Sequence, residues 1–171
     1  MLDNPRFAGL DDITALVDLM ADFYAESEYS LPRAIAAQAF STLLADPRLG
    51  RVLILGVDGT PVGYVVVTFG FSMEYGGLRG FVDDFFVKPE ARDQGVGSAA
   101  LQAVRDICAD LGVRALLVET DPESDSARRL YERAGFADTG RLLFSQALAS
   151  AVHEGSTSQE TVQPTPSNTA R

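Results

Sequence analysis

Residues 92–98 read RDQGVGS; they follow the short apolar run FFV at 85–87 and open a strongly helical segment. A helix start leaves several backbone N–H groups without internal partners and carries a partial positive charge, so the main chain alone can hold a phosphate there. Gly95 and Gly97 lack a Cβ and tolerate a positive φ, which lets the turn bend tightly, and the guanidinium of Arg92 matches phosphate oxygens. The stretch therefore predicts a site for a ligand that carries a pyrophosphate.

The overall composition favours one globular domain with an acidic surface. The chain has 171 residues, and its 24 acidic residues against 14 Lys and Arg give a formal net charge of −10. That charge disfavours nucleic acid or an anionic membrane as a partner and suits a cationic small molecule, although surplus acid often only keeps a surface soluble. No run approaches the ~18 apolar residues of a membrane span and no signal-peptide pattern is seen, so we expect a cytoplasmic protein.

The scarcity of cysteine and histidine limits the chemistry that the chain can perform. Cys108 is the only cysteine and falls on an apolar helical stripe, which is typical of a core residue. His153 is the only histidine and lies near the C-terminus, so Ser-His-Asp chemistry, Cys-His chemistry and histidine metal sites are not expected. Acid–base work must use carboxylates, tyrosine or water.

Hydrophobic periodicity and turn signals place strands and helices in one domain that spans residues 1–150. Strands are expected at 6–8, 51–57, 61–71, 79–87, 114–120 and 138–148. Helices are expected from Asp11 or Asp12 to Ala25, from after Ser30 to before Pro47, and at 95–111 and 125–134. Asp58-Gly59 predicts a hairpin turn, and the polar stretch 151–171 predicts a disordered tail.

A dinucleotide-binding fingerprint is the main competing interpretation of the glycine motif. Gly95, Gly97 and Ala100 satisfy G-x-G-x-x-A, and Glu119 follows at a suitable distance. In that fold the first glycine follows its strand almost directly, whereas here residues 88–94 intervene and an antiparallel hairpin precedes the unit. The fingerprint interpretation is therefore disfavoured.

Two motifs resemble those of a known family. Residues 82–98, VDDFFVKPEARDQGVGS, resemble motif A of the GCN5-related N-acetyltransferases (GNAT), and residues 127–136, ARRLYERAGF, resemble motif B. The resemblance implies an α+β (mixed α/β) fold in which a mostly antiparallel sheet contains a splayed parallel pair and is flanked by about four helices. It implies acetyl-CoA as co-substrate without a metal, a small-molecule amine as acceptor, and a family in which homodimers are common. The DDFFV string and the loop at 75–77 are most similar to polyamine (diamine) N-acetyltransferases.

The resemblance also implies where acetyl-CoA lies. Its pyrophosphate would sit on the backbone amides of 94–98 with Arg92 beside it, and its pantetheine arm would follow the strand at 85–87. A family asparagine that contacts this arm is replaced by Ser124, so that contact is weaker or comes from another residue. The cofactor-binding residues implied by motif A are Phe85, Phe86, Val87, Arg92, Asp93, Gln94, Gly95, Val96, Gly97 and Ser98.

Three residues take catalytic roles by the same resemblance. Tyr131 matches the tyrosine that commonly protonates the coenzyme A thiolate, although its spacing fits a packed aromatic equally well. Asp84 is expected to hold or deprotonate the amine. Glu119 ends its predicted strand near the same cleft and would hold a water or act as base, or would be only a solvated strand end.

Acceptor binding is assigned to acidic and aromatic residues near the predicted cleft. Asp83 and Asp84 are adjacent in a strand, so we expect their side chains to point to opposite faces, with Asp83 in a structural or rim position. A salt bridge from either one to Arg79 is the structural alternative. The remaining acceptor-binding candidates are Glu28, Tyr29 and Glu74.

A different functional class is compatible with the same motifs. A non-catalytic module that binds acyl-CoA as a sensor or docking domain would use the same phosphate loop without turnover. Release of free coenzyme A that depends on an amine would separate the two classes.

Overall fold

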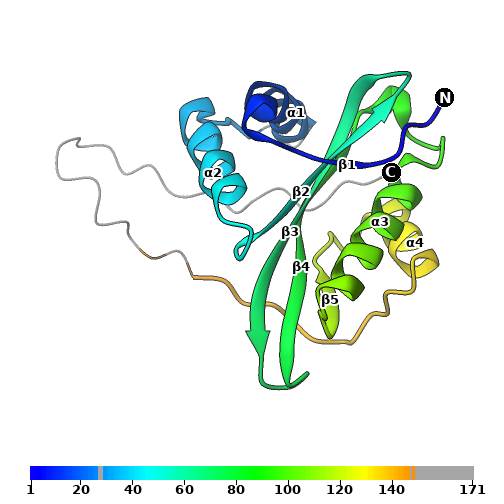
Figure 1. The fold of residues 1–171 in the computed structure, drawn as a ribbon. Helices are drawn as coiled ribbons and strands as arrows, with labels where there is room; N and C mark the ends of the chain where they lie inside the picture. The colour runs from blue at the N-terminus through cyan, green and yellow to red at the C-terminus, as the bar shows by residue number, and fades with distance from the viewer. Residues whose placement is uncertain (27–28, 147, 149–171) are drawn as a thin grey trace.

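The computed structural model describes residues 1–26, 29–146 and 148, and it places a five-stranded sheet between two layers of helices (Figure 1). The strands, in their order across the sheet, are β1 (Arg6–Phe7), β2 (Gly50–Val57), β3 (Thr60–Ser72), β4 (Gly77–Val87) and β5 (Ala115–Val118). The helices are α1 (Ile13–Glu26), α2 (Arg33–Ala45), α3 (Val96–Asp110) and α4 (Asp125–Arg133), with 3-10 turns at Leu10–Asp12 and Pro89–Ala91. Strands β1 to β4 are antiparallel to their neighbours, whereas β4 and β5 are parallel. The predicted fold class is confirmed.

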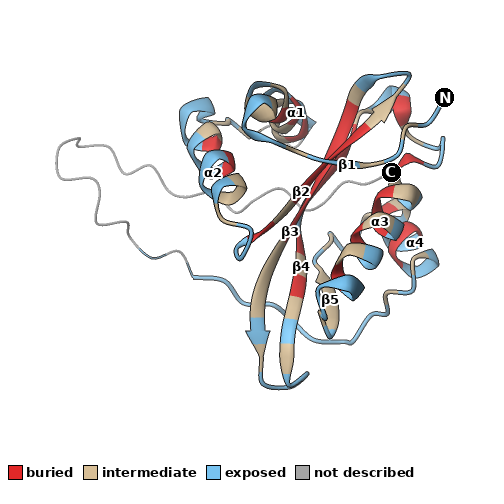
Figure 2. Cartoon of the chain, viewed as in Figure 1, coloured by how far each residue is buried: buried red, intermediate tan, exposed pale blue. Residues whose placement is uncertain are grey.

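Each face of the sheet carries its own hydrophobic core. Successive strand residues point to opposite faces, so the neighbours Phe85 and Phe86 are both fully buried but belong to different cores. Phe86 packs with α1 and α2 residues such as Phe23, and Phe85 packs with α3 and α4 residues such as Leu101. Burial is concentrated at residues 52–55 of β2, 62–67 of β3 and 84–87 of β4, and Figure 2 shows it also on the helix sides that face the sheet. Strands β2, β3 and β4 therefore each contribute residues to both cores.

The predicted last strand at 138–148 is wrong for the residues that the structure describes there, 138–146 and 148. They form no strand, and Leu142 and Phe144 are 81% and 87% exposed. Arg141 instead forms an ion pair of 2.8 Å with Glu74 in the β3–β4 turn, which holds the segment beside that turn. An alternating pattern forms a strand only where a neighbouring edge takes up its hydrogen bonds, and within the described residues this segment has no such pairing. The predicted tail 151–171 lies outside the described residues.

Among the described residues, every helix falls short of the length and apolar content that crossing a bilayer requires.

Candidate active site at the β4–β5 gap

Strands β4 and β5 separate partway along their length. Their parallel pairing runs from Arg79 opposite Ala115 to Val82 opposite Val118, where β5 ends. Strand β4 continues to Val87 and stays paired with β3 on its other side. The outer edge of β4 over residues 83–87 thus lies beyond its pairing with β5, and this is the splayed parallel pair that the sequence motifs predicted.

The backbone of Val87 is directed into this gap. In an antiparallel ladder, successive residues turn their N–H and C=O groups to alternate edges. The N–H of Lys88 donates to Val62 O of β3 at 2.8 Å, so the N–H and C=O of Val87 face the opposite edge. An amide at this position can donate to a ligand oxygen in the gap.

The loop between β4 and α3 presents backbone amides to solvent at a helix start. Gly95 is the N-cap of α3 and adopts φ 83°, and Asp93 adopts φ 59°. The side chain of Gln94 donates from Nε2 to Glu90 O at 2.8 Å, which fixes the loop from within. Asp93, Gln94, Gly95 and Ser98 are exposed. The loop has the geometry of an anion site, since orphan N–H groups at a helix start meet solvent here.

The two motif glycines have different roles. Only Gly95 adopts a positive φ, so the expectation that Gly97 uses one is wrong; Gly97 is the second residue of α3. A Cβ on Gly97 would lie 3.1 Å from Leu130 Cδ2 and 3.7 Å from Phe85 Cζ. The missing side chain at 97 therefore lets α3, α4 and β4 pack closely, whereas Gly95 bends the loop.

We expect Gly95→Ala to weaken coenzyme A binding by about tenfold, because a non-glycine residue in this left-handed conformation costs about 1–2 kcal/mol. A Cβ at 95 would meet no atom within 4 Å, so the effect is conformational and not steric. Gly59→Ala is the matched control, since Gly59 has φ 75° and equally open surroundings in the β2–β3 turn. Calorimetric titration should show an unchanged Kd for Gly59→Ala; equal Kd values for both variants would contradict the loop assignment.

Arg92 is engaged by protein groups. Its Nε donates to Val87 O at 2.8 Å and its Nη2 to Glu26 Oε1 of α1 at 2.5 Å, while the guanidinium carbon lies 5.9 Å from the centroid of the Phe86 ring. The Arg92 side chain is only 10% exposed. A direct contact between Arg92 and a pyrophosphate stays a prediction.

A β-bulge interrupts the side-chain alternation of β4 at the two adjacent aspartates. The β3–β4 register shifts so that Val66 pairs with Asp84 and Val67 with Val82, which leaves Asp83 as the extra residue. Val82 and Phe85 accordingly share the α3–α4 core although they are three residues apart. The expectation that Asp83 and Asp84 point to opposite faces rests on an unbroken alternation, and the bulge at Asp83 interrupts that alternation.

Asp84 is buried against the α1–α2 layer. It is 7% exposed and accepts a hydrogen bond of 3.1 Å from the hydroxyl of Tyr64, which is fully buried. Burial and the nearby charge of Asp83 raise the pKa of Asp84 to about 6, although the Tyr64 hydrogen bond opposes this shift. Burial also raises the pKa of the more exposed Asp83. Among the described residues, neither aspartate forms a salt bridge to Arg79. The raised pKa of Asp84 is typical of a base that works near neutral pH.

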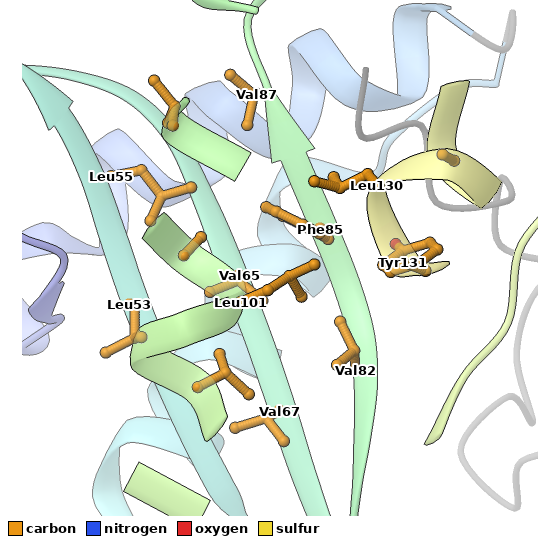
Figure 3. Packing of buried hydrophobic residues seen from close by; sticks show 14 of the residues in the cluster. Leu53, Leu55, Val65, Val67, Val82, Phe85, Val87, Leu101, Leu130 and Tyr131 are labelled. Carbon is orange, nitrogen blue, oxygen red and sulfur yellow. The ribbon is translucent and has the colours of Figure 1, made fainter. Parts of the chain in front are cut away.

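Tyr131 lies on the other side of the sheet, in α4. Its side chain is buried within the α3–α4 core, and its ring contacts Phe136 edge-on at 5.6 Å. Figure 3 shows the hydroxyl on the side of the ring that faces β4. This buried hydroxyl has no hydrogen-bond partner in the described part of the chain. Burial raises the pKa of Tyr131, which keeps the phenol protonated, as a proton donor requires.

The carboxyl end of β5 contributes residues to the same gap. Glu119 follows β5 directly and is exposed, and the hydroxyl of Thr120 is buried without a partner among the described residues. Ser124 is the N-cap of α4 but makes no side-chain capping hydrogen bond. Since buried hydroxyls are normally paired, the hydroxyls of Thr120 and Tyr131 are candidates for hydrogen bonds to a ligand.

The other predicted acceptor-binding residues, Tyr29, Glu74 and Glu28, lie in two separate parts of the chain. Tyr29 follows α1, and its N–H donates to Tyr24 O at 3.0 Å. Glu74 lies in the β3–β4 turn, beyond Gly77, the first residue of β4; Gly77 is seven strand residues from Asp84, a length of roughly 20 Å at the usual strand rise. Glu28 lies outside the described residues. The structure therefore brings Asp83 and Asp84 together and leaves Glu74 remote from them.

Two residues near this site, Tyr64 and Thr120, stand in no motif of the sequence. Tyr64 reads as one more apolar position of β3, and only its register opposite Phe86, next to the bulge, shows that its hydroxyl reaches Asp84. Thr120 carried no motif; its position directly after Glu119 was the available signal.

Comparison with known proteins places this geometry in a family. The model of the acetyltransferase (GNAT) family matches residues 13–136. An uncharacterized N-acetyltransferase, YhfO, of Bacillus subtilis (strain 168) is 29% identical over 138 residues, which cover 80% of this chain and 92% of that protein. A thialysine N-epsilon-acetyltransferase of Bos taurus is 33% identical over 89 residues, about half of each chain.

The solved structures agree with this assignment. An integron cassette protein, HFX_CASS3, from the mobile metagenome of Cole Harbour Salt Marsh has 53% sequence identity and a TM-score of 0.79, with 88% of this chain and 94% of that chain covered. The family match extends over both motifs, the splayed strands and the glycine loop. The chain thus belongs to the acetyltransferase (GNAT) family and is an acetyl-CoA-dependent N-acetyltransferase.

Proposed function

We propose that this enzyme acetylates a primary amine on a cationic small molecule, such as a polyamine, and that the reaction takes place in the β4–β5 gap. The observation that carries the proposal is the separation of β4 and β5 beyond Val82 and Val118, directly beside the glycine loop that caps α3. The pyrophosphate of acetyl-CoA would accept hydrogen bonds from amides of residues 94–98. The pantetheine arm would follow residues 85–87, with its thioester near the amide of Val87.

The two proposed proton-transfer groups lie on opposite faces of the sheet. Asp84 belongs to the α1–α2 side, where it contacts Tyr64, and Tyr131 belongs to the α3–α4 side. The gap beyond Val82 is where β4 has no β5 alongside it, so a thioester there can meet groups from both faces. This arrangement suits an amine that approaches from the α1–α2 side and a thiolate that leaves toward α4.

The proposed chemistry is direct attack in a ternary complex. An alkylamine is protonated at neutral pH, with a pKa of about 10, so a base must remove its proton first. Asp84 takes that proton directly, or a water held by Glu119 does. The amine nitrogen then bonds to the thioester carbon, and the Val87 amide stabilises the oxyanion. As the carbon–sulfur bond breaks, Tyr131 gives its proton to the sulfur, the nitrogen loses its second proton to water, and Tyr131 regains a proton from water. Holding both reactants in one gap supplies much of the rate.

The preference for a cationic acceptor rests on charge. The carboxylate of Asp83 lies near enough to Asp84 to raise its pKa, and the formal net charge of the chain is −10. An acceptor with a second positive charge would pair with Asp83 while its reacting amine meets Asp84. The similarity to a thialysine acetyltransferase is in keeping with a flexible diamine-like acceptor.

A panel of amines tests the proposal through the release of free coenzyme A thiol. We expect diamines and polyamines to give a kcat/KM at least about tenfold above that of a neutral-bodied monoamine of equal length, and Asp83→Asn to reduce this ratio mainly through KM. Equal kcat/KM values across the panel would contradict charge recognition at Asp83. The family match favours an enzyme over the non-catalytic acyl-CoA-binding module, so release with other amines but not with diamines or polyamines would overturn the proposed acceptor class.

A further inference from the structure

Two ion pairs join the end of α1 to the connection between β4 and α3. Asp22 and Glu26 lie one helical turn apart on α1, and Lys88 and Arg92 flank the 3-10 turn Pro89–Ala91. Lys88 Nζ lies 3.3 Å from Asp22 Oδ2, and Arg92 Nη2 lies 2.5 Å from Glu26 Oε1. The chain segment that leads into the cofactor loop is therefore held to the helix that precedes the predicted acceptor residues.

The two pairs differ in burial. The Arg92 and Glu26 side chains are 10% and 25% exposed, whereas those of Lys88 and Asp22 are 32% and 54% exposed. Arg92 is further fixed by its hydrogen bond to Val87 O and by its position over the Phe86 ring. Breaking a largely covered ion pair leaves an uncompensated charge, while an exposed pair contributes little. The Arg92–Glu26 contact is thus the stronger of the two connections.

We propose that Arg92 is a positioning residue that couples the cofactor loop to the end of α1 through Glu26, so that coenzyme A binding orders the acceptor side of the site. Arg92 directly precedes the loop residues Asp93 to Ser98, and α1 ends at Glu26, three residues before Tyr29. A ligand that fixes the loop also fixes the Arg92 backbone and hence its ion pair. Because linkage is reciprocal, an acceptor that orders the end of α1 raises coenzyme A affinity by the same factor. This inference rests on the proposed placement of the pyrophosphate at the loop.

The Glu26→Gln variant separates this role from direct phosphate binding, because the two roles predict effects of opposite sign. If Arg92 were a phosphate ligand, removing the Glu26 charge would free the guanidinium and remove a repulsive anion, so coenzyme A would bind equally well or more tightly. As a positioning residue, Arg92 loses its anchor, and we expect the Kd for coenzyme A to rise by about fivefold. Asp22→Asn is the matched control on the exposed pair, with an expected change below about twofold.

Hydrogen exchange measures the coupling itself, with coenzyme A as the probe and no acceptor present. In the wild-type protein, saturating coenzyme A should slow amide exchange in the last turn of α1, residues 22–26, by about fivefold or more. In Glu26→Gln this slowing should shrink below about twofold, while Asp22→Asn retains it. A purely structural defect would speed exchange with and without coenzyme A and leave their ratio unchanged.

Coenzyme A binding by the wild type and by Glu26→Gln distinguishes a failure of the coupling from a failure of the proposed function. If coenzyme A binds the wild type but Glu26→Gln keeps both the affinity and the slowing, the coupling role of Arg92 is overturned and the acetyl-transfer proposal stands. Tighter binding by Glu26→Gln would assign Arg92 to the phosphates. If coenzyme A fails to bind the wild type, the placement of the pyrophosphate and the coupling fall together.

Discussion

Replacing Tyr131 by phenylalanine is expected to lower kcat by about 100-fold, the usual scale for the loss of one positioned acid. The free energy of unfolding should stay the same or rise by up to about 1 kcal/mol, because the variant loses a buried hydroxyl that has no partner among the described residues. The ring contact with Phe136 at 5.6 Å is retained. Steady-state kinetics under conditions where chemistry limits the rate, together with thermal unfolding, checks both expectations.

Phe136→Leu is the matched control for the packing role of Tyr131. It keeps the hydroxyl and removes the aromatic contact, so it should cost about 1 kcal/mol of stability and change kcat by less than about threefold. The Kd for acetyl-CoA should move by less than about threefold in Tyr131→Phe, since little contact area is lost. A kcat of Tyr131→Phe within twofold of wild type would mean that the thiolate leaves unprotonated, and Tyr131 would then be a packed aromatic only.

Local sequence signals were sufficient to predict the β2–β3 hairpin turn and the strand, loop and helix that run from β4 to α3. The Asp58-Gly59 turn has both residues at positive φ, as its hairpin prediction requires. The strand, loop and helix from β4 to α3 follow from an apolar run, a glycine in a left-handed N-cap and helical periodicity, all within about 30 residues. These features depend on neighbours in the chain and can therefore be read from it.

Features that depend on distant partners could not be predicted from the sequence. The bulge at Asp83 is a property of the pairing between β3 and β4, so a strict alternation of side chains could not predict it. The contact of Arg92 with Glu26 joins residues 66 positions apart, and motif A alone gives no sign of it. The alternation at 138–148 predicted a strand, but no strand forms in its described part, where Arg141 pairs with Glu74 of the β3–β4 turn. In each case the deciding interaction lies outside the local window.

The burial of Asp84 has opposite consequences for stability and for activity as pH changes. The folded-state pKa of about 6 lies above the ordinary value of 3.8, so the folded protein holds this proton more tightly than the unfolded chain. The stability that results is fully present below about pH 4 and is lost as pH rises through about 6, a total of roughly 3 kcal/mol. Activity follows the reverse course, because a base must be ionised, and kcat/KM should fall about tenfold per pH unit below about pH 6.

Asp84→Asn is therefore expected to lower kcat by about 100-fold or more while making the protein more stable than wild type at pH 8. Asparagine can still accept the hydrogen bond from Tyr64 but carries no charge that burial penalises. Denaturant unfolding at pH 4 and pH 8 measures the gain in stability, which should be confined to the higher pH, and calorimetry should show nearly unchanged coenzyme A affinity.

Asp83→Asn is the control for the pH effect: it removes the neighbouring charge, so the pKa of Asp84 falls and the acid limb of kcat/KM moves to lower pH. Wild-type kcat in Asp84→Asn, with the expected gain in stability, would show that Asp84 is buried without acting as the base and would transfer that role to a water held by Glu119.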